Sequence, residues 1–462
     1  MNTETVAAPD RVSQLLAGLD VPGPRYTSYP TADRFDDDFG AARYREALAA
    51  RAAAGQAAAP LSIYVHVPFC ESICYYCACN KVVTRHHEQA QPYLAALERE
   101  IALHVGALGR GQPVSQLHLG GGSPTFLSNA ELDRLLATLR AAFAIAPQAE
   151  LSIEVDPRTV DAARLRHLAA LGFNRLSFGV QDFDPEVQRA VHREQPYEQV
   201  HALMREARAL RFGSINVDLI YGLPRQTPES FAVTVAQVAG LRPDRIALYA
   251  YAHLPQRFKP QRRIHAHELP IGSERVHMLR SAISGFQRHG YAYIGMDHFA
   301  LPDDPLAFAK RQGRLHRNFQ GYSTQPDCDL IGLGVSAIGQ VGGCYAQNAK
   351  TLAGYEAALA RGVFATERGL APDADDRLRR TVIMALMCQG RVDFDAIGSD
   401  VAARLRGELE RLRVHEAQGL VTVEPGRIEL TPLGWYFVRA IAMVFDRHLQ
   451  EDAQRDRYSR VV

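Results

Sequence analysis

The stretch LSIYVHVPFCESICYYCACNK, residues 61–81, decides the fold of this chain. Its first part, 61–69, is rich in β-branched and aromatic residues, which is typical of a buried strand. Four cysteines then follow within ten residues: Cys70, Cys74, Cys77 and Cys79. Because the sites of α/β barrels lie at the carboxyl ends of their strands, this placement predicts a functional centre directly after the first strand.

Strands and helices alternate from this point on. Helical patterns, for example at 92–108 and 131–144, separate the strand-like runs. The strand-like runs are 61–69, 114–120, 150–156, 175–181, 215–223 and 245–254. Six strands separated by helices predict parallel βαβ units. We therefore expect an α/β fold with an incomplete (β/α)6-type barrel.

The length of 462 residues predicts more than one domain. We interpret residues 1–60 as an N-terminal extension that an Ala-rich helix closes at about 40–58, and residues 61–370 as the barrel domain. Residues 371–462 would form a small C-terminal domain. Its segment 419–438 predicts a two-stranded wing followed by a helix, hence a winged-helix-like domain. It lacks a concentrated basic face, which favours packing or a lid role over nucleic-acid binding.

The regular alternation stops after residue 255. Segment 256–267 is basic and without periodicity, and 290–300 predicts a strand with its loop. Segment 329–343 is rich in glycine, and we expect it to cover the site together with segment 316–325.

Composition narrows the classes of partner. The 52 basic and 51 acidic residues nearly cancel, so no global field favours nucleic acid or an anionic membrane. We find no apolar run of 18 residues and no signal-peptide pattern at the N-terminus, and we expect no membrane association. These features predict a cytoplasmic protein, and no interface signal argues against a monomer.

In a reducing compartment, four crowded thiols indicate a metal before a disulfide. In the spacing C-x3-C-x2-C, three thiolates can occupy three corners of a four-iron cluster. The fourth iron then stays open to the amino and carboxylate groups of a small molecule. Three alternatives remain: a zinc site, which normally splits its thiolates into two distant pairs, a closed cluster with Cys79 as the fourth ligand, and buried cysteines without a reactive role. We interpret Cys328, Cys344 and Cys388 as small apolar residues.

Polar residues follow one face of three predicted strands, as the period of two in a strand requires. The faces consist of Glu150, Ser152, Glu154 and Asp156, of Ser177, Gly179 and Gln181, and of Asn216 and Asp218. Parallel strands are usually buried on both faces, so three polar rows indicate a bound ligand or water. A solvated sheet edge is the alternative.

Gly120, Gly121 and Gly122 follow the second strand directly, and glycines allow a ligand to approach the backbone closely. Taken alone, the triplet also fits a tight turn, and it is not a P-loop because no Gly-Lys-Ser/Thr follows. Glu154, at the end of the third strand, could accept hydrogen bonds from the same ligand.

The cysteine spacing, followed one strand later by the glycine loop, resembles the radical SAM superfamily. Within it, the chain resembles the family of oxygen-independent coproporphyrinogen III oxidases over nearly its whole length. The motifs that carry this resemblance are PRYTSYPTA (24–32), YVHVPFCESICYYCACNK (64–81), HLGGGSPT (118–125), GMDHFA (295–300), HRNFQGY (316–322), DLIGLGVSAI (329–338) and YSRVV (458–462).

The resemblance implies a [4Fe–4S] cluster and two molecules of S-adenosylmethionine (SAM). It implies oxidative decarboxylation of two propionates of coproporphyrinogen III to vinyl groups by a 5′-deoxyadenosyl radical, which yields protoporphyrinogen IX in haem biosynthesis. An electron donor and an electron acceptor, both unidentified, would be partners. Two alternatives are a haem-binding chaperone of the same superfamily, which lacks the PRYTSYP and CACNK motifs, and a winged-helix regulator.

The resemblance also implies roles for individual residues. The cluster ligands would be Cys70, Cys74 and Cys77. Contacts to the cluster-bound SAM would come from Tyr64, Gly121, Glu154 and Ile338. Contacts to the second SAM would come from Tyr76, Gly122, Ser123, Gln181, Arg193, Asp218 and Ala252. The chain departs from the family at Tyr76, where Phe is usual, and at Ser123, where Thr is common. Residues implied in catalysis are Tyr64, His66, Phe319 and Gln320, although Phe319 also fits plain core packing.

The four propionates of such a substrate require cations, and Arg is suited to planar carboxylates. The N-terminal extension would then be an arm on the substrate side. Candidate anchors are Arg25, Arg257, Lys259, Arg262 and Arg263, with a solvated loop at 256–267 as the alternative.

Overall fold

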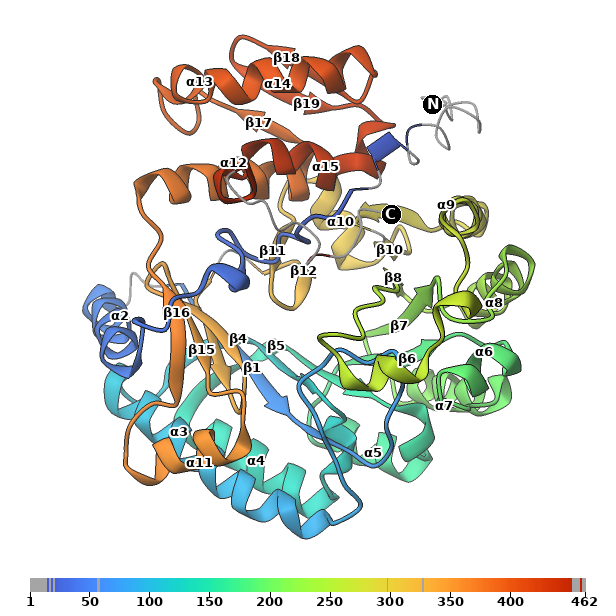
Figure 1. Ribbon diagram of the computed structural model, residues 1–462. Coiled ribbons are helices and arrows are strands. Elements are labelled where there is room, and N and C mark those ends of the chain that lie inside the picture. Colours follow the sequence, from blue (N-terminus) through green and yellow to red (C-terminus); the bar gives the residue numbers. More distant parts are fainter. Residues whose placement is uncertain are drawn as a thin grey trace.

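The computed structural model describes residues 15, 18–19, 21–55, 59–296, 298–325, 328–450 and 458. Within these residues the chain forms a twelve-stranded central sheet in the order β16-β15-β14-β13-β1-β4-β5-β6-β7-β8-β10-β9. Helices cover the outer face of this sheet, and a smaller layer of helices and strands lies on the other side of the molecule (Figure 1). The remainder of the YSRVV motif after Tyr458 lies outside the described residues.

Parallel strands form the middle of the sheet, each hydrogen-bonded to the next. They are β1 (Leu61–Val67), β4 (Gln112–Gly121), β5 (Phe143–Val155), β6 (Arg175–Gln181), β7 (Ser214–Tyr221) and β8 (Arg245–Ala250). The helices between them are α3 (Ala90–Leu108), α4 (Asn129–Ala142), α5 (Ala162–Ala170), α6 (Pro185–Ala190), α7 (Tyr197–Ala209) and α8 (Pro228–Leu241). All six predicted strands are present, which confirms the α/β class with a parallel core.

Strand β5 begins at Phe143 and not at 150 as predicted. Pro147 interrupts the apolar pattern in its first half, and a register shift between Val114 and Gln116 of β4 accommodates the irregularity. Proline cannot donate to a sheet ladder, so the sequence pattern understated the length of this strand.

The expectation that segment 329–343 covers the site is wrong. It supplies β13 (Leu330–Leu333), which pairs parallel with β1, and β14 (Ile338–Val341), which is antiparallel to β13. A Cβ atom at Gly332 would lie 2.6 Å from the Ile338 carbonyl oxygen. The glycines that suggested a loop therefore allow two neighbouring strands to pack closely.

Further antiparallel strands extend the sheet at both ends. On one side are β15 (Cys344–Asn348) and β16 (Thr366–Leu370), with α11 (Leu352–Ala360) between them. On the other side, segment 290–300 forms the hairpin of β9 (Ala292–Gly295) and β10 (His298–Ala300), which follows α9 (Gly272–Arg288). Segment 316–325 forms a separate hairpin of β11 (His316–Asn318) and β12 (Gly321–Ser323), after α10 (Pro305–Arg311).

The C-terminal elements gather on the side of the molecule opposite α3 and α4 (Figure 1). Their helices are α12 (Ala374–Gln389), α13 (Val401–Arg404), α14 (Arg406–Ala417), α15 (Val438–Ala442) and α16 (Arg447–Gln450). A three-stranded sheet joins β17 (Arg391–Asp393), β19 (Arg427–Leu430) and β18 (Val421–Glu424). The predicted wing is therefore present as the β18–β19 hairpin, whereas the three domain boundaries stay predictions.

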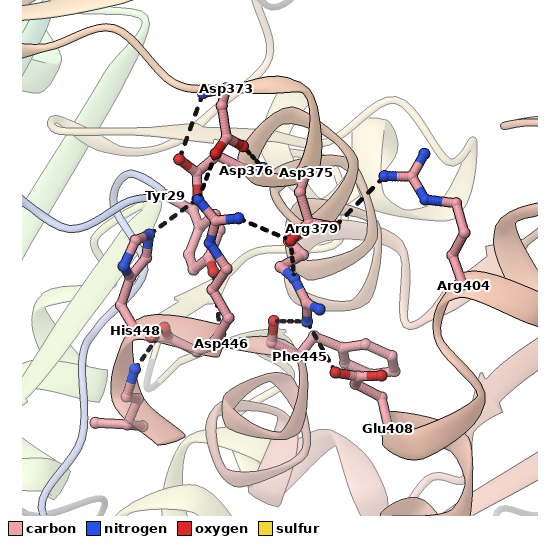
Figure 2. A network of polar contacts seen from close by, with 12 residues as sticks. Tyr29, Asp373, Asp375, Asp376, Arg379, Arg404, Glu408, Phe445, Asp446 and His448 are labelled. Atoms are coloured by element: carbon pink, nitrogen blue, oxygen red, sulfur yellow. Dashed lines mark hydrogen bonds and ion pairs between the residues drawn. The ribbon is translucent and has the colours of Figure 1, made fainter. Parts of the chain in front are cut away.

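The N-terminal segment crosses from the C-terminal layer to the central sheet and reaches α2 (Ala41–Ala54), close to the predicted Ala-rich helix. Tyr26 donates to Asp446, Arg439 donates to the Pro24 carbonyl, and the Tyr29 carbonyl accepts from Tyr345 of β15. Figure 2 shows the polar network around Tyr29 and His448, in which charged residues of α12 and α14 take part. The ion pairs of this network include Arg447–Asp373, Arg447–Asp376, Arg379–Asp375 and Arg379–Glu408.

Among the described residues, every helix is too short or too polar to cross a lipid bilayer.

Candidate functional site

A cavity of about 420 Å³ opens at the carboxyl ends of the parallel strands. The cysteine loop after β1, the glycine loop after β4 and the end of β5 form its wall. The predicted site residues that line it are Cys70, Cys74, Cys77, Tyr76, Gly121, Gly122, Ser123, Glu154, Gln181, Arg193 and Asp218. The fold therefore brings most of the predicted site residues to one place.

Backbone pairing closes the cysteine loop at its base. Residues 69–70 form β2 (Phe69–Cys70), which pairs with β3 (Val82–Val83). Lys81 donates from Nζ to the carbonyls of Cys77 and Cys79 at 3.2 and 3.3 Å. The loop is thus a closed unit that holds all four cysteines. Lys81 was not among the predicted site residues.

The Cys74 thiol is buried and lies beside two guanidinium groups. Arg193 donates from Nη1 to Cys74 Sγ at 3.5 Å, and Arg158 donates from Nη2 to the same sulfur at 3.6 Å. The Asp156 carboxylate pairs with both arginines. Burial alone would raise the pKa of Asp156, but the charges of Arg193 and Arg158 outweigh it and hold the pKa at about 2. Sequence patterns placed Asp156 on a polar face but did not reveal this pairing.

The thiols of Cys70, Cys74 and Cys77 line one cavity, where a bound cluster could reach them. In a tetrahedral zinc site, bonds of 2.3 Å bring the sulfurs to about 3.8 Å from one another. Within the described part of the chain, no three Cys, His, Asp or Glu side chains are close enough to share one metal ion. Separate irons of one cluster bind separate thiolates, so Cys70, Cys74 and Cys77 on one cavity wall fit a [4Fe–4S] cluster.

Thiol ionisation differs along the loop. Burial, together with the neighbouring Cys77 and Cys74, raises the pKa of Cys70 to about 12. A hydrogen bond from the exposed Cys79 lowers the pKa of Cys77. Because a thiol must lose its proton to bind a metal, loading of Cys70 would release a proton. Cys79 contacts Cys77 here, and its role as a non-ligand stays a prediction.

The glycine loop packs against the end of β1. A Cβ atom at Gly121, whose φ is +119°, would lie 2.7 Å from the His66 ring, and one at Gly122 would lie 2.6 Å from the Pro68 carbonyl oxygen. The Gly121 N–H donates to Glu154 Oε2 at 3.0 Å. These glycines pack against the end of β1 and orient Glu154, and Gly121 and Gly122 also line the cavity, so their contact with a ligand stays a prediction.

Tyr64 and His66 lie behind this loop and line neither of the cavities described here. His66 Nε2 is 2.9 Å from the Asn80 carbonyl oxygen, which can only accept, so Nε2 carries the proton. Nδ1 then accepts from the Tyr64 hydroxyl at 3.0 Å. Burial lowers the pKa of His66, which favours this neutral form. His66 thereby connects β1 to the end of the cysteine loop.

A second, smaller cavity of about 110 Å³ lies deeper inside the barrel. Ser152, Ser177 and Asn216 from the polar strand faces line it, and Glu154 and Asp218 line both cavities. Since β5, β6 and β7 are central strands of the sheet, the alternative of a solvated edge is wrong. Burial, and after it the charge of Glu154, raises the pKa of Asp218 to about 6.

The remaining predicted residues lie around these cavities. The Ala252 carbonyl accepts from Gln261 Nε2 at 3.1 Å, and the same amide donates to the Tyr76 carbonyl at 3.0 Å. Ile338 opens β14, two strands from β1. Phe319 packs edge-on against Tyr345 with ring centroids 6.0 Å apart and is only partly buried.

Gln320 lines the inner cavity, and its buried amide nitrogen and oxygen have no hydrogen-bond partner among the described residues. Tyr322 and Ser323, which follow it on β12, line the same cavity. Segment 316–325 therefore borders the inner cavity, and its role as a cover of the active site stays a prediction.

The candidate anchors for substrate carboxylates separate into two groups. Those of the basic loop are exposed and line neither cavity: Arg257, Lys259, Arg262 and Arg263. Arg25 instead lies with its guanidinium carbon 5.3 Å from the centre of the Tyr249 ring, and Tyr249 lines both cavities. Arg317, which was not predicted, is buried with its guanidinium 4.6 Å from the centre of the Tyr322 ring.

Comparison with known protein families gives two matches. The Radical SAM superfamily matches residues 64–238, and the HemN C-terminal domain matches residues 373–437. The first match contains the cysteine loop and β4–β7, and the second contains α12–α14 and the wing.

Curated relatives match over nearly their full length. Two similar proteins are named oxygen-independent coproporphyrinogen III oxidase. The one from Pseudomonas aeruginosa is 48% identical, and the match covers 97% of this chain and 98% of the relative. The one from Escherichia coli is 49% identical, and the match covers 95% of this chain and 96% of the relative. The solved structure of the radical SAM enzyme coproporphyrinogen III oxidase (HemN) from Escherichia coli superposes with a TM-score of 0.88. It is 49% identical, and the match covers 92% of this chain and 97% of that one.

Proposed function

This chain belongs to the radical SAM superfamily and, within it, to the oxygen-independent coproporphyrinogen III oxidases, and we propose that the cavity at Cys70, Cys74 and Cys77 is its active site. The enzyme oxidises coproporphyrinogen III without oxygen in haem biosynthesis. Each of two propionate side chains would lose a hydrogen atom from its β-carbon, then carbon dioxide, and one electron that passes to the acceptor. Both would thereby become vinyl groups, which gives protoporphyrinogen IX.

The observation that carries this proposal is the position of three cysteines on one cavity wall at the carboxyl ends of the parallel strands. The three thiolates would hold a [4Fe–4S] cluster and leave one iron open. When bound, the cluster and SAM together supply a 5′-deoxyadenosyl radical that removes a hydrogen atom from the propionate β-carbon. The protein holds these groups, orients the substrate and excludes water.

Glu154 would hold the SAM that the open iron binds. Its Oε2 accepts from the Gly121 N–H, which fixes the carboxylate at the cavity wall where a SAM amino group could donate to it. We propose that Tyr64 of β1 and Ile338 of β14, the two strands on either side of β13, complete this site. Tyr64 would act together with His66 by holding the end of the cysteine loop.

A second SAM would lie beside the first. The Arg193 Nε–H is buried and lacks a hydrogen-bond partner among the described residues, as expected if an acceptor of a bound ligand belongs there. Asp218 and Gln181 line the same cavity and offer a carboxylate and an amide. The remaining residues of this site would be Tyr76, Gly122, Ser123 and Ala252.

Substrate carboxylates would meet cations at the mouth of the cavity, where Arg25 lies over Tyr249. In the inner cavity, the Gln320 amide would donate a hydrogen bond to a propionate or to a water molecule beside a pyrrole ring. Phe319 would support the hairpin that holds Gln320. We propose further that the enzyme is a cytoplasmic monomer. It would work with a separate electron donor and a separate electron acceptor, and without nucleic acid.

One anaerobic assay tests the proposal. The chain is reconstituted with iron and sulfide and mixed with SAM, a reductant, an electron acceptor and coproporphyrinogen III. The products are analysed by mass spectrometry. We expect loss of two carbon dioxide molecules per tetrapyrrole together with 5′-deoxyadenosine, and neither product from Cys74→Ser. Cleavage of SAM without decarboxylation would contradict the substrate, and haem binding without SAM cleavage would favour the chaperone alternative.

A further inference from the structure

The Cys74 sulfur accepts hydrogen bonds from two arginines at once, Arg193 at 3.5 Å and Arg158 at 3.6 Å. Hydrogen bonds to the sulfurs of an iron–sulfur cluster are one of the means by which a protein sets its reduction potential. Arg193 is already placed among the contacts to the second SAM. Arg158 has no role in the function proposed above.

Local backbone geometry holds the Arg158 side chain in place. Asp156 ends the polar face of β5 and caps the short 3-10 helix η5 (Pro157–Thr159), where its Oδ1 accepts from the Arg158 backbone N–H at 3.1 Å. The same carboxylate accepts from Arg158 Nε at 2.9 Å and from Nη2 at 2.6 Å. This two-pronged contact fixes the plane of the guanidinium, so that Nη2 also reaches Cys74.

The carboxylate of Asp156 is shared. It also accepts from Arg193 Nη1 and Nη2, each at 3.3 Å. Two positive charges therefore face one carboxylate and the Cys74 sulfur, and the surplus positive charge lies next to a cluster ligand. The side chains of Asp156 and Arg193 are each 8% exposed and that of Arg158 is 19% exposed, so water screens these charges only weakly.

We propose that Arg158 sets the reduction potential of the cluster through its hydrogen bond to Cys74. The inference rests on the proposed function, because it requires the cluster at Cys70, Cys74 and Cys77. Reduction adds one negative charge to the cluster, and a guanidinium that donates to a ligand sulfur stabilises the reduced state more than the oxidised state. Arg158 acts through Cys74, so it is a positioning residue and not a catalytic one.

The experiment compares three variants with the wild-type chain, each reconstituted anaerobically. Arg158→Leu removes the charge and the donor. Arg158→Lys keeps the charge but loses the planar fork that Asp156 holds. Arg166→Leu is the matched control, because Arg166 lies on the nearby helix α5, is 57% exposed and pairs with Glu206. Iron and sulfide content are measured first, and the midpoint potential is then determined by an electron paramagnetic resonance redox titration without SAM.

We expect Arg158→Leu to lower the midpoint potential, with the reduced state disfavoured about tenfold, which is about 59 mV for one electron. The midpoint potential of Arg158→Lys should lie between that of Arg158→Leu and that of the wild type. For Arg166→Leu, the equilibrium between reduced and oxidised cluster should differ from the wild type by less than about twofold. The inference is overturned if Arg158→Leu holds a full cluster at the wild-type potential, or if the control shifts equally. If the wild-type chain itself assembles no cluster, the proposed function fails, and this inference fails with it.

Discussion

The backbone N–H of Gly121 donates a 3.0 Å hydrogen bond to Glu154 Oε2 and so joins the glycine-rich end of β4 to the end of β5. The other carboxylate oxygen, Oε1, lies 3.5 Å from His118 Nε2. One acidic side chain is therefore oriented by a loop and a neighbouring strand before any ligand arrives. A site of this kind is preorganised, and its precision depends on the glycine that can adopt the required backbone angles.

Gly121→Ala should disrupt this arrangement. The residue has φ +119°, and a methyl group there would meet the His66 ring at 2.7 Å, so we expect about 1–3 kcal/mol of lost stability. SAM affinity, measured by equilibrium dialysis on the reconstituted protein, should fall at least tenfold. Gly106→Ala is the control, because no atom lies within 4 Å of the added methyl group in helix α3. Unchanged SAM binding by Gly121→Ala would refute the positioning role of the loop.

Removing a cluster ligand should abolish the cluster. Cys70→Ser, Cys74→Ser and Cys77→Ser should each lose the broad visible absorbance of the reconstituted protein, because three thiolates are needed to hold three irons. Cys79→Ser should keep this absorbance, since Cys79 is exposed and donates to Cys77. Loss of the cluster in Cys79→Ser would restore the closed four-cysteine alternative.

Tyr26→Phe tests the contact between the N-terminal segment and the C-terminal layer. The Tyr26 hydroxyl donates to Asp446 Oδ2 at 3.0 Å, and both residues are buried. Loss of this buried hydrogen bond should lower the free energy of unfolding by about 1–3 kcal/mol in urea titrations. Tyr75→Phe should change it by less than about 0.5 kcal/mol, because the Tyr75 hydroxyl accepts from the exposed Arg263 guanidinium at 3.2 Å, where water can replace the bond. Equal effects of the two variants would argue against the importance of this contact.

Glu100 should make stability depend on pH. Burial raises its pKa to about 7, against the hydrogen bonds from Tyr355, Gly334 and Asn348. Between about pH 4.5 and 7 the folded state then binds more protons than the unfolded state, so this group makes stability fall as pH rises. Its contribution to the slope is at most about 1.4 kcal/mol per pH unit.

His104 has the opposite effect on stability, because burial lowers its pKa to about 4. Between this pH and the pKa of an unfolded histidine, about 6.5, it makes stability rise with pH. The comparison of wild type with Glu100→Gln isolates the carboxyl group, since His104 is common to both. Urea titrations at pH 5 and pH 7.5 should show a smaller loss of stability with rising pH in the variant. If the free energy of unfolding changed equally between pH 5 and pH 7.5 in both proteins, Glu100 would not titrate in this range.

Local patterns in the sequence predicted much of the site. The cysteine spacing, the glycine loop and the polar face that contains Glu154 and Asp218 were all predicted, because each depends on residues close together in the chain. The strand alternation indicated which side of the sheet these carboxylates occupy. The same kind of pattern failed at 329–343, where glycines that suggested a loop serve two packed strands.

The sequence by itself therefore determined the six parallel strands with the helices between them, the identity of the three candidate ligands and the family. Only the tertiary structure decided which charges meet. Arg158 reaches Cys74 across 84 positions, and Tyr26 reaches Asp446 across 420. Periodicity and spacing describe neighbours within one element, whereas contacts between distant elements depend on how the sheet brings their ends together.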